Sequence, residues 1–264
     1  MADNRQNFDP RTSFRLDGTV CVVTGAGTGI GRAIAFAAAR SGARVQVLDR
    51  NADAAAQTRA DIAAENLYAA DWHVDVADEA AIEKTFAAIA AAEGRIDSLV
   101  NNAGLAIRRP AVDLPLADWN RVVDVNMTGV FLCARTAARY MLPRGGGAIV
   151  NMSSIMGLSG GGLYPNISYQ TTKGAVVNLT RALAIEWAAQ NIRVNAVAPT
   201  WVRTEFIRPL LDKPELVARM QGATPLGRVA EVDEIVGAVI FLLSPAAAMI
   251  TGHTLPVDGG YLAQ

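Results

Sequence analysis

The chain has 264 residues, of which 51% are hydrophobic and 19% charged, and its 24 basic side chains nearly balance its 25 acidic ones. This length fits one large domain or two small ones, and the composition is typical of a globular protein rather than a disordered one. The near-zero formal charge argues against a nucleic-acid partner and against binding to an anionic membrane, because both interactions rely on a basic surface.

No segment has the features of a membrane anchor or a secretion signal. The apolar run 235–243 is about half as long as a bilayer-spanning helix. The N-terminus is polar and lacks the apolar centre of a signal peptide. Residues 1–16 are also aperiodic, which predicts an N-terminal arm outside the domain. We therefore expect a cytoplasmic protein.

From Thr19 onward, short runs rich in valine and isoleucine alternate with longer helical stretches. The predicted strands are Val20–Thr24, Arg44–Asp49, Tyr68–Val74, Ser98–Asn101, Ala148–Met152, Arg193–Val197 and Thr254–Val257. The predicted helices are Ile30–Ser41, Ala52–Glu65, Glu79–Glu93, Trp119–Met141, Tyr169–Ala189 and Val232–Leu243. The alternation predicts one α/β domain over residues 17–264, with a doubly wound parallel sheet and helices on both faces. The proline-containing segment 203–227 breaks the rhythm and predicts a substrate lid.

The cysteines and histidines give no sign of a metal site. Cys21 and Cys133 lie in apolar surroundings and are predicted to be buried free thiols. His73 and His253 have no partner at ligand spacing. We therefore expect no metal.

The first strand runs into residues 24–31, with the sequence TGAGTGIG. Glycines after a strand allow a tight bend and a close approach of the backbone to a pyrophosphate, while the following helix offers free N–H groups to the anion. Gly25, Gly29 and Gly31 form a Gly-x-x-x-Gly-x-Gly pattern rather than Gly-x-Gly-x-x-Gly. The turn predicts a dinucleotide phosphate site, and a purely structural turn is the alternative.

Two aspartates follow the next strands. Asp49 ends the second strand, where a carboxylate can accept hydrogen bonds from ribose hydroxyls and repel a 2′-phosphate. NAD is therefore favoured over NADP, although the adjacent Arg50 could hold such a phosphate. Asp75 follows the third strand and suits the adenine edge, with a helix N-terminal role as the alternative.

Tyr169 and Lys173 lie four residues apart in a predicted helix, which places them on one face. A phenol is a poor base at neutral pH, and a nearby ammonium favours its ionised form. Alone, a tyrosine and a lysine at this spacing are common and mean little. Together with the glycine turn, the pair predicts an acid–base group whose phenol pKa is lowered by the lysine.

Several motifs together resemble the short-chain dehydrogenase/reductase family, over about residues 16–262. The resemblance covers TGAGTGIG at 24–31, NNAG at 101–104, Pro199 with Thr204, and DGG at 258–260. It also covers that family's catalytic tetrad, which matches Asn126, Ser154, Tyr169 and Lys173.

The resemblance implies a Rossmann-like sheet of about seven strands and a nicotinamide cofactor. Tyr169 is expected to exchange a proton with the substrate, Ser154 to hydrogen-bond the substrate oxygen, and Lys173 to hold the nicotinamide ribose. Asn126 is expected to fix a water that relays the proton. The cofactor-binding residues implied by the matching positions are Gly25, Thr28, Gly29, Ile30, Gly31, Asp49, Asp75, Val76, Asn102, Ala103, Gly104, Tyr169, Lys173, Pro199, Val202 and Thr204.

Two positions depart from the family pattern. Thr200 stands where the family usually has glycine, in a loop that approaches the nicotinamide. Tyr169 follows Ser154 by 15 positions, two more than in the commonest pattern, so residues 157–168 form a longer loop that should line the substrate pocket. Ser153 is a rival for the role of Ser154.

The loop and the lid combine hydrogen-bonding and aromatic side chains, which suits a sugar or polyol. The loop length and the Arg-Leu-Asp-Gly start at residues 15–18 also resemble family members that act on sugars and polyols. The function predicted is therefore NAD-dependent interconversion of a secondary alcohol and a ketone on such a small-molecule substrate. One alternative is an NADPH-dependent 3-oxoacyl thioester reductase, with Arg108 and Arg109 as a basic entrance. Another is a catalytically silent nicotinamide-binding protein. Apolar residues around the circumference of helix 169–189, together with the family resemblance, predict a homotetramer.

Overall fold

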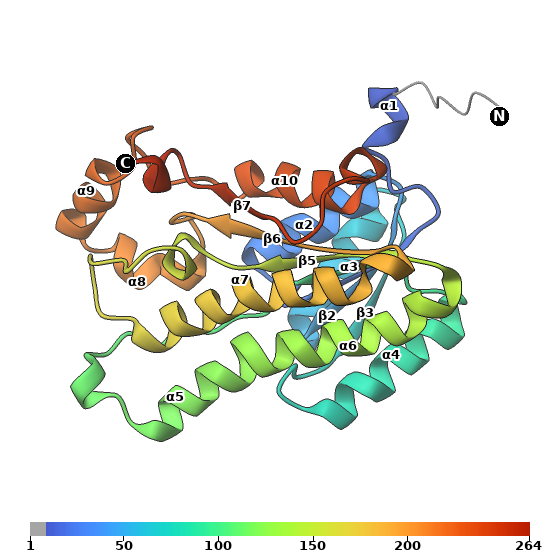
Figure 1. The fold of residues 1–264 in the computed structure, drawn as a ribbon, viewed down its shortest axis with the longest axis horizontal. Coiled ribbons are helices and arrows are strands. Elements are labelled where there is room, and N and C mark those ends of the chain that lie inside the picture. Colours follow the sequence, from blue (N-terminus) through green and yellow to red (C-terminus); the bar gives the residue numbers. More distant parts are fainter. Residues whose placement is uncertain (1–8) are drawn as a thin grey trace.

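The computed structural model describes residues 9–264 and contains a seven-stranded parallel sheet with the order β3-β2-β1-β4-β5-β6-β7. Figure 1 shows this sheet running through the centre of the molecule. The sequence-based fold prediction is confirmed. The strands are β1 (Val20–Thr24), β2 (Arg44–Asp49), β3 (Ala69–His73), β4 (Ser98–Asn101), β5 (Gly147–Met152), β6 (Ile192–Pro199) and β7 (Thr254–Val257).

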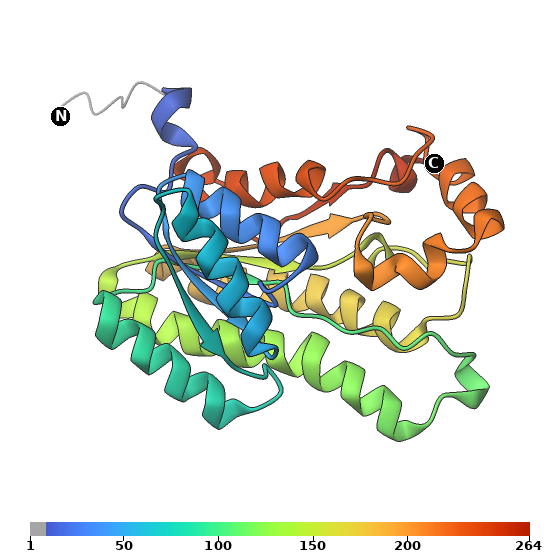
Figure 2. The same ribbon diagram turned by 180° about the vertical axis from the view of Figure 1, so that it is seen from behind.

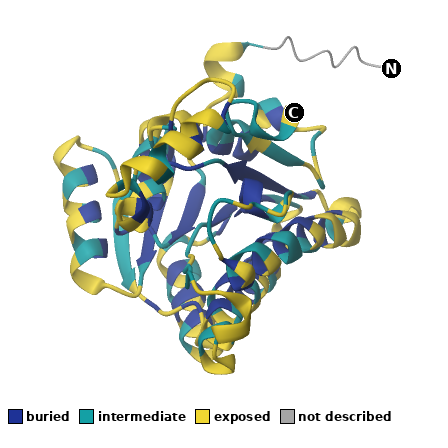
Figure 3. Ribbon diagram, turned by 90° about the vertical axis from the view of Figure 1, so that its left-hand side faces the viewer, coloured by how far each residue is buried: buried dark blue, intermediate teal, exposed yellow. Residues whose placement is uncertain are grey.

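Helices cover both faces of the sheet, because alternate residues of each strand point to opposite sides. In β1, Val20 and Val22 pack with α4, α6 and α7, whereas Cys21 and Val23 pack with α2, α3 and α10. Figures 1 and 2 show these two layers, and Figure 3 shows buried strands between helices with exposed outer faces. The helices are α2 (Gly29–Arg40), α3 (Ala52–Ala64), α4 (Glu79–Glu93), α5 (Leu116–Val123), α6 (Gly129–Met141), α7 (Ile167–Trp187) and α10 (Asp233–Leu243).

The strand order places a binding crevice at one end of the sheet. The chain runs outward from β1 to β2 and β3, and then returns to β4 on the other side of β1. Connections on the two sides of this switch point leave in opposite directions, which opens a space beyond the carboxyl ends of the strands. At the far edge, β7 contains Pro256, a residue that sheets tolerate at their edges.

The predicted helix 119–141 is interrupted in the structure. α5 and α6 are joined without a break by one π-helical turn, Asp124–Thr128, which contains Asn126. A π-helical turn inserts an extra residue and changes the direction of the side chains, and such turns occur often at functional sites. The amphipathic pattern of the sequence continues through the turn, so periodicity alone could not reveal it.

The predicted N-terminal arm, residues 1–16, lies partly outside the described residues, because residues 1–8 are not described. In the described part of the arm, α1 (Pro10–Ser13) is capped by Asp9, whose side chain accepts a hydrogen bond from the backbone N–H of Arg11. Phe14 packs on the ring of Phe241 in α10, with ring centroids 5.9 Å apart, and Leu16 is buried in the core. Residues 14–16 are therefore part of the domain surface and core rather than of a free arm.

The segment 203–227 folds into short helices over the carboxyl end of the sheet. These are the 3₁₀ turn Glu205–Ile207, α8 (Arg208–Leu211) and α9 (Pro214–Gly222). Ile207, Leu210 and Met220 form a small apolar cluster with Trp201 and Met156. This cluster is separate from the two sheet cores, so the segment packs on the domain as a distinct layer.

Cys21 and Cys133 are buried free thiols, as the sequence predicts, and burial raises their pKa values to about 11 and about 12. Over residues 9–264, no three His, Cys, Asp or Glu side chains gather as a metal site would require. Within the same range, no helix combines the length and the apolar character needed to cross a membrane.

Candidate active site

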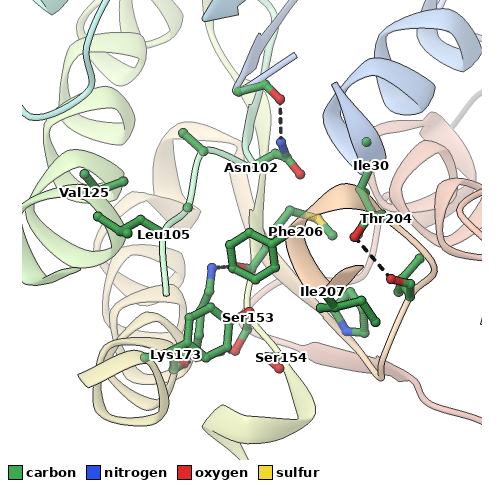
Figure 4. Close-up of a pocket in the computed structure, with 18 of the residues that line it drawn as sticks. Ile30, Asn102, Leu105, Val125, Ser153, Ser154, Lys173, Thr204, Phe206 and Ile207 are labelled. Carbon is green, nitrogen blue, oxygen red and sulfur yellow. Dashed lines mark hydrogen bonds between the residues drawn. The ribbon is translucent and has the colours of Figure 1, made fainter. Parts of the chain in front are cut away.

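A cavity of about 330 Å³ lies at the carboxyl ends of the strands, on both sides of the switch point. Segments that follow β1, β2, β3, β4, β5 and β6 all contribute to its wall, together with the start of α7. In the view of Figure 4, Asn102 and Ile30 lie at one end, and Lys173 and Ser154 lie at the other. The cavity is therefore built by the elements that the sequence motifs mark.

The glycine turn forms the end of the cavity beside β1. Gly25 and Gly29 have φ values of 62° and 55°, which glycine adopts without strain. A Cβ on Gly31 would collide with the carbonyl oxygen of Gly25 and with Nδ2 of Asn102. The helix must therefore start directly against the turn, which leaves the N-terminus of α2 open toward the cavity.

Asn102 fixes the shape of this turn. Its Nδ2 donates to the carbonyl oxygens of Thr24 and Gly25, each at 3.0 Å. The hydroxyl of Thr24 in turn accepts from the backbone N–H groups of Asn102 and Ala103, each at 3.1 Å. The sequence elements TGxxxGIG and NNAG are therefore two halves of one hydrogen-bonded unit.

Asp49 lines the cavity at the end of β2, as predicted, and also holds the turn. Its Oδ2 accepts from the N–H of Gly27 at 2.8 Å, and its Oδ1 accepts from the N–H of Asn51 at 2.9 Å. Arg50 and Asp75 line the same region, and Asp75 accepts from the N–H of Ala77. Asp49 and Arg50, the two candidates for choosing between NAD and NADP, therefore line the same region of the cavity.

Tyr169, Lys173 and Ser154 meet on the opposite part of the wall. Lys173 is 3% exposed; its Nζ donates to the carbonyl oxygen of Met152 at 2.6 Å and lies 5.5 Å from the centre of the Tyr169 ring. Ser154 starts a 3₁₀ turn after β5, where its hydroxyl accepts from the N–H of Met156. The predicted proton donor, cation and oxygen ligand therefore share one site.

The two serines have different partners. The hydroxyl of Ser153 donates to the carbonyl oxygen of Lys173 at 3.0 Å and ties β5 to α7. Hydrogen bonding to Ser154 acts on Tyr169 and favours the ionised phenol. Ser154 is therefore the better placed of the two for the substrate oxygen.

The predicted lowering of the Tyr169 pKa is not found in this structure. Burial raises the pKa of Tyr169 to about 12, against smaller lowering effects of Ser154 and Arg108. Burial also lowers the pKa of Lys173 to about 8. The expectation considered only the charge of Lys173, whereas removal from water opposes the ionised form of both groups.

Two predicted site residues do not reach the cavity wall. Asn126 is fully buried: its Oδ1 accepts from the N–H of Leu105, and its Nδ2 donates to the carbonyl oxygen of Leu105, both at 2.8 Å. A further bond links it to Thr172. Its side chain therefore positions the segment after β4 against α7. Gly31 likewise lies behind the turn. All the other predicted residues line the cavity.

The wall near Tyr169 also contains side chains that motif matching did not single out. Tyr164 accepts a hydrogen bond from Nε1 of Trp201 at 3.0 Å, and the ring of Phe206 lies 6.0 Å from that of Tyr169. Arg108 donates to the carbonyl oxygen of Phe206, and its buried Nε has no hydrogen-bond partner among residues 9–264. The sequence signals for this wall were the aromatic content of the loop and lid and the basic entrance predicted at Arg108.

The residues present fit a nicotinamide dinucleotide. The close packing at Gly31 leaves a helix N-terminus facing the cavity, Asp49 lines the cavity at the end of β2, and the hydroxyl of Thr200 is buried in the wall without a partner among residues 9–264. Thr200, the departure from the family glycine, therefore adds a free hydrogen-bonding group to the loop after β6.

Comparisons with known proteins agree with this geometry. A model of the short-chain dehydrogenase/reductase family, described as enoyl-(acyl carrier protein) reductase, matches residues 25–262. Galactitol 2-dehydrogenase (L-tagatose-forming) of Cereibacter sphaeroides is 46% identical over 96% of this chain and 99% of its own length. D-threitol dehydrogenase of Mycolicibacterium smegmatis is 43% identical over 94% of each chain.

A solved structure has the same fold and carries a cofactor. The gluconate 5-dehydrogenase from Burkholderia cenocepacia, in complex with NADP and tartrate, aligns with a TM-score of 0.94 and 37% identity, over 97% of this chain and 100% of that one. The chain therefore belongs to the short-chain dehydrogenase/reductase family, as an NAD(P)-dependent oxidoreductase that acts on CH–OH groups.

Proposed function

We propose that this protein interconverts a secondary alcohol and a ketone on a sugar or polyol, with NAD preferred over NADP. The observation that carries the proposal is the meeting of Ser154, Tyr169 and Lys173 in the cavity that also holds the glycine turn. The relatives named for galactitol, threitol and gluconate support this substrate class.

In this proposal the residues of the tetrad handle the proton and hold the reactants. Tyr169 takes the proton from the substrate hydroxyl during oxidation and returns it during reduction. Ser154 hydrogen-bonds the same oxygen, which keeps the reacting carbon in place. Lys173 holds the nicotinamide ribose beside Tyr169. Asn126 positions the segment after β4, and its π-helical turn is where the proposed relay water would bind.

The bound nicotinamide supplies the hydride-accepting chemistry, and the protein supplies orientation and proton handling. The remaining residues proposed to hold the cofactor are Gly25, Thr28, Gly29, Ile30, Asp49, Asp75, Val76, Asn102, Ala103, Gly104, Pro199, Val202 and Thr204. Gly31 supports them from behind the turn. The NAD preference rests on the Asp49 carboxylate, which would repel a 2′-phosphate at the end of β2.

A panel of polyols, sugar acids and simple secondary alcohols tests the proposal. Each compound is supplied with NAD or NADP, and formation of the reduced nicotinamide is followed by absorbance. We expect oxidation of polyols with a higher kcat/KM for NAD. A preference for NADP would assign the cofactor choice to Arg50. If no alcohol in the panel gives reduced nicotinamide, the substrate assignment is refuted.

A 3-oxoacyl thioester reductase is the second candidate, because Arg108 lines the cavity and Arg109 is exposed beside it. Two adjacent cations could receive the anionic arm of a thioester. Consumption of NADPH with acetoacetyl-coenzyme A, at a kcat/KM above that for any polyol oxidation, would favour this candidate.

We further propose that the active protein is a homotetramer and that segment 203–227 acts as a lid. On α7, Val176, Val177 and Leu183 are buried, whereas Ile185 is 81% exposed. Phe131 on α6 is also exposed. Apolar side chains on the outer face of long helices suit an isologous interface. Light scattering at micromolar concentration should give a mass of about four chains, and a fully active monomer would contradict the assembly.

A further inference from the structure

Asn166 is a buried polar residue of the cavity wall that the proposed chemistry does not use. It precedes α7, three positions before Tyr169, and is 4% exposed. Asparagine in this N-cap position usually accepts a hydrogen bond from the first turn of the helix. Here the side chain makes no capping bond, and its Oδ1 is buried with no partner among the described residues.

An unpaired buried acceptor is costly, and folded proteins rarely keep one without a reason. Asn151, elsewhere in the same protein, shows the usual arrangement. Its Nδ2 donates to the hydroxyl of Thr180 at 3.0 Å, and its Oδ1 accepts from Nδ2 of Asn101 at 2.9 Å. Asn166 therefore differs from Asn151 in that its acceptor has no partner among the described residues.

The neighbouring groups do not compete for this acceptor. The hydroxyl of Tyr164 accepts a hydrogen bond from Trp201 Nε1. Gln170 donates instead to the carbonyl oxygen of Gly160, and Arg219 to that of Leu163. These bonds fix the loop before α7, so Asn166 is held on the wall of the cavity rather than free to turn away.

Asn166 lies near Tyr169 in the sequence, and Tyr169 is the residue proposed to contact the reacting alcohol. Asn166 is the residue directly before α7, and Tyr169 lies in the first turn of that helix. Both residues line the cavity. A substrate whose alcohol meets Tyr169 therefore lies in the same cavity as Asn166.

We propose that Asn166 Oδ1 accepts a hydrogen bond from a second hydroxyl, on the carbon next to the one that reacts, so that the enzyme selects vicinal diols. The proposal rests on the alcohol oxidation proposed above and makes Asn166 a specificity-determining residue. An alcohol without that hydroxyl leaves the acceptor unpaired in the complex, and sites built to bind a hydroxyl strongly reject analogues that lack it.

The test compares butane-2,3-diol with butan-2-ol, which differ by one hydroxyl, in the wild type and in Asn166→Leu. We expect the wild type to prefer the diol in kcat/KM by about tenfold or more. In Asn166→Leu, kcat/KM for the diol should fall while that for butan-2-ol stays, so that the ratio approaches one. An unchanged ratio in the variant would overturn the proposal.

Thermal unfolding separates substrate recognition from a structural role. Leucine has a similar shape and no unpaired acceptor, so Asn166→Leu should leave the midpoint unchanged or raised. The same change at Asn151 breaks paired bonds and should lower the midpoint. If both variants lose stability equally, Asn166 is structural and the inference fails. If the wild type oxidises no alcohol with either nucleotide, the proposed function fails and takes the inference with it.

Discussion

The two ends of the cavity differ in how their polar groups are used. At the glycine turn, the side chains of Thr24, Asp49 and Asn102 bond to the backbone around them and are paired within the protein. Near Tyr169, in contrast, Asn166 and Arg108 keep buried polar atoms without a partner among residues 9–264. One end is a preassembled binding frame, and the other leaves hydrogen-bonding capacity to a ligand.

This difference separates residues that hold the shape of the cavity from residues that could contact a substrate. The frame is set by residues that bond to one another, so a change in any of them distorts the turn itself. The unpaired groups near Tyr169 lie in the loop before α7 and in the segment after β4. A change there alters which substrate completes the bonds, while the fold stays intact.

The largest effect is expected from Tyr169→Phe, which removes the proton-transferring hydroxyl and keeps the ring. We expect kcat to fall by about 10²-fold or more, as for the loss of a positioned acid–base group. Steady-state oxidation of a polyol measures it. A variant that keeps most of its activity would show that Tyr169 does not transfer the proton, and that the reaction is not assigned to this end of the cavity.

Gly31→Ala tests the frame. A Cβ at this position would collide with the backbone carbonyl of Gly25, which cannot move without opening the turn. We expect stability to fall by about 1–3 kcal/mol, as for overpacking in a core. The control is Gly237→Ala in α10, where nothing lies within 4 Å of the added Cβ. Denaturant unfolding should show a loss only for Gly31→Ala, and equal losses would contradict the close packing.

Asp49→Asn tests whether the carboxylate at the frame chooses the cofactor. Asparagine keeps one acceptor for the backbone but loses the charge that opposes a 2′-phosphate. We expect the kcat/KM ratio of NAD to NADP to fall by about tenfold, which corresponds to about 1.4 kcal/mol of lost discrimination. A ratio unchanged from the wild type would move the selection to Arg50.

The smallest expected effect is a pH-dependent stability that originates at Lys173. Burial lowers its pKa from 10.5 to about 8, so between these values the unfolded chain binds more protons than the folded one. Stability from this group therefore rises with pH, by about 1 kcal/mol between pH 7.5 and 9. The raised pKa of Tyr169 acts only above pH 10, whereas the raised pKa values of the buried thiols Cys21 and Cys133 oppose the rise as the pH approaches 9. The contribution of Lys173 is therefore read from the difference between variants that share both thiols.

The measurement is the free energy of unfolding at both pH values for the wild type, Lys173→Met and Lys84→Met. Lys84 is exposed on α4 and serves as the control. The rise should disappear in Lys173→Met and persist in Lys84→Met. An identical rise in all three proteins would show that Lys173 is not responsible.

The fold was predictable because buried strands and glycine stops leave strong local signals. β1, β2, β4, β7 and α4 have the predicted bounds. The π-helical turn at Asn126 was not predictable, because hydrophobic periodicity does not register one inserted residue. The unpaired state of Asn166 and the raised pKa of Tyr169 also escaped prediction. Both depend on burial among residues that are distant in the sequence.

The separation of the two ends is tested most directly by calorimetric titration of NAD into Tyr169→Phe, Asn166→Leu and Gly31→Ala. If the frame binds the cofactor on its own, the first two variants should keep a Kd within a few-fold of the wild type. Gly31→Ala should bind at least about tenfold more weakly, a loss of about 1.4 kcal/mol. Wild-type affinity in Gly31→Ala, or lost affinity in the two other variants, would contradict the account.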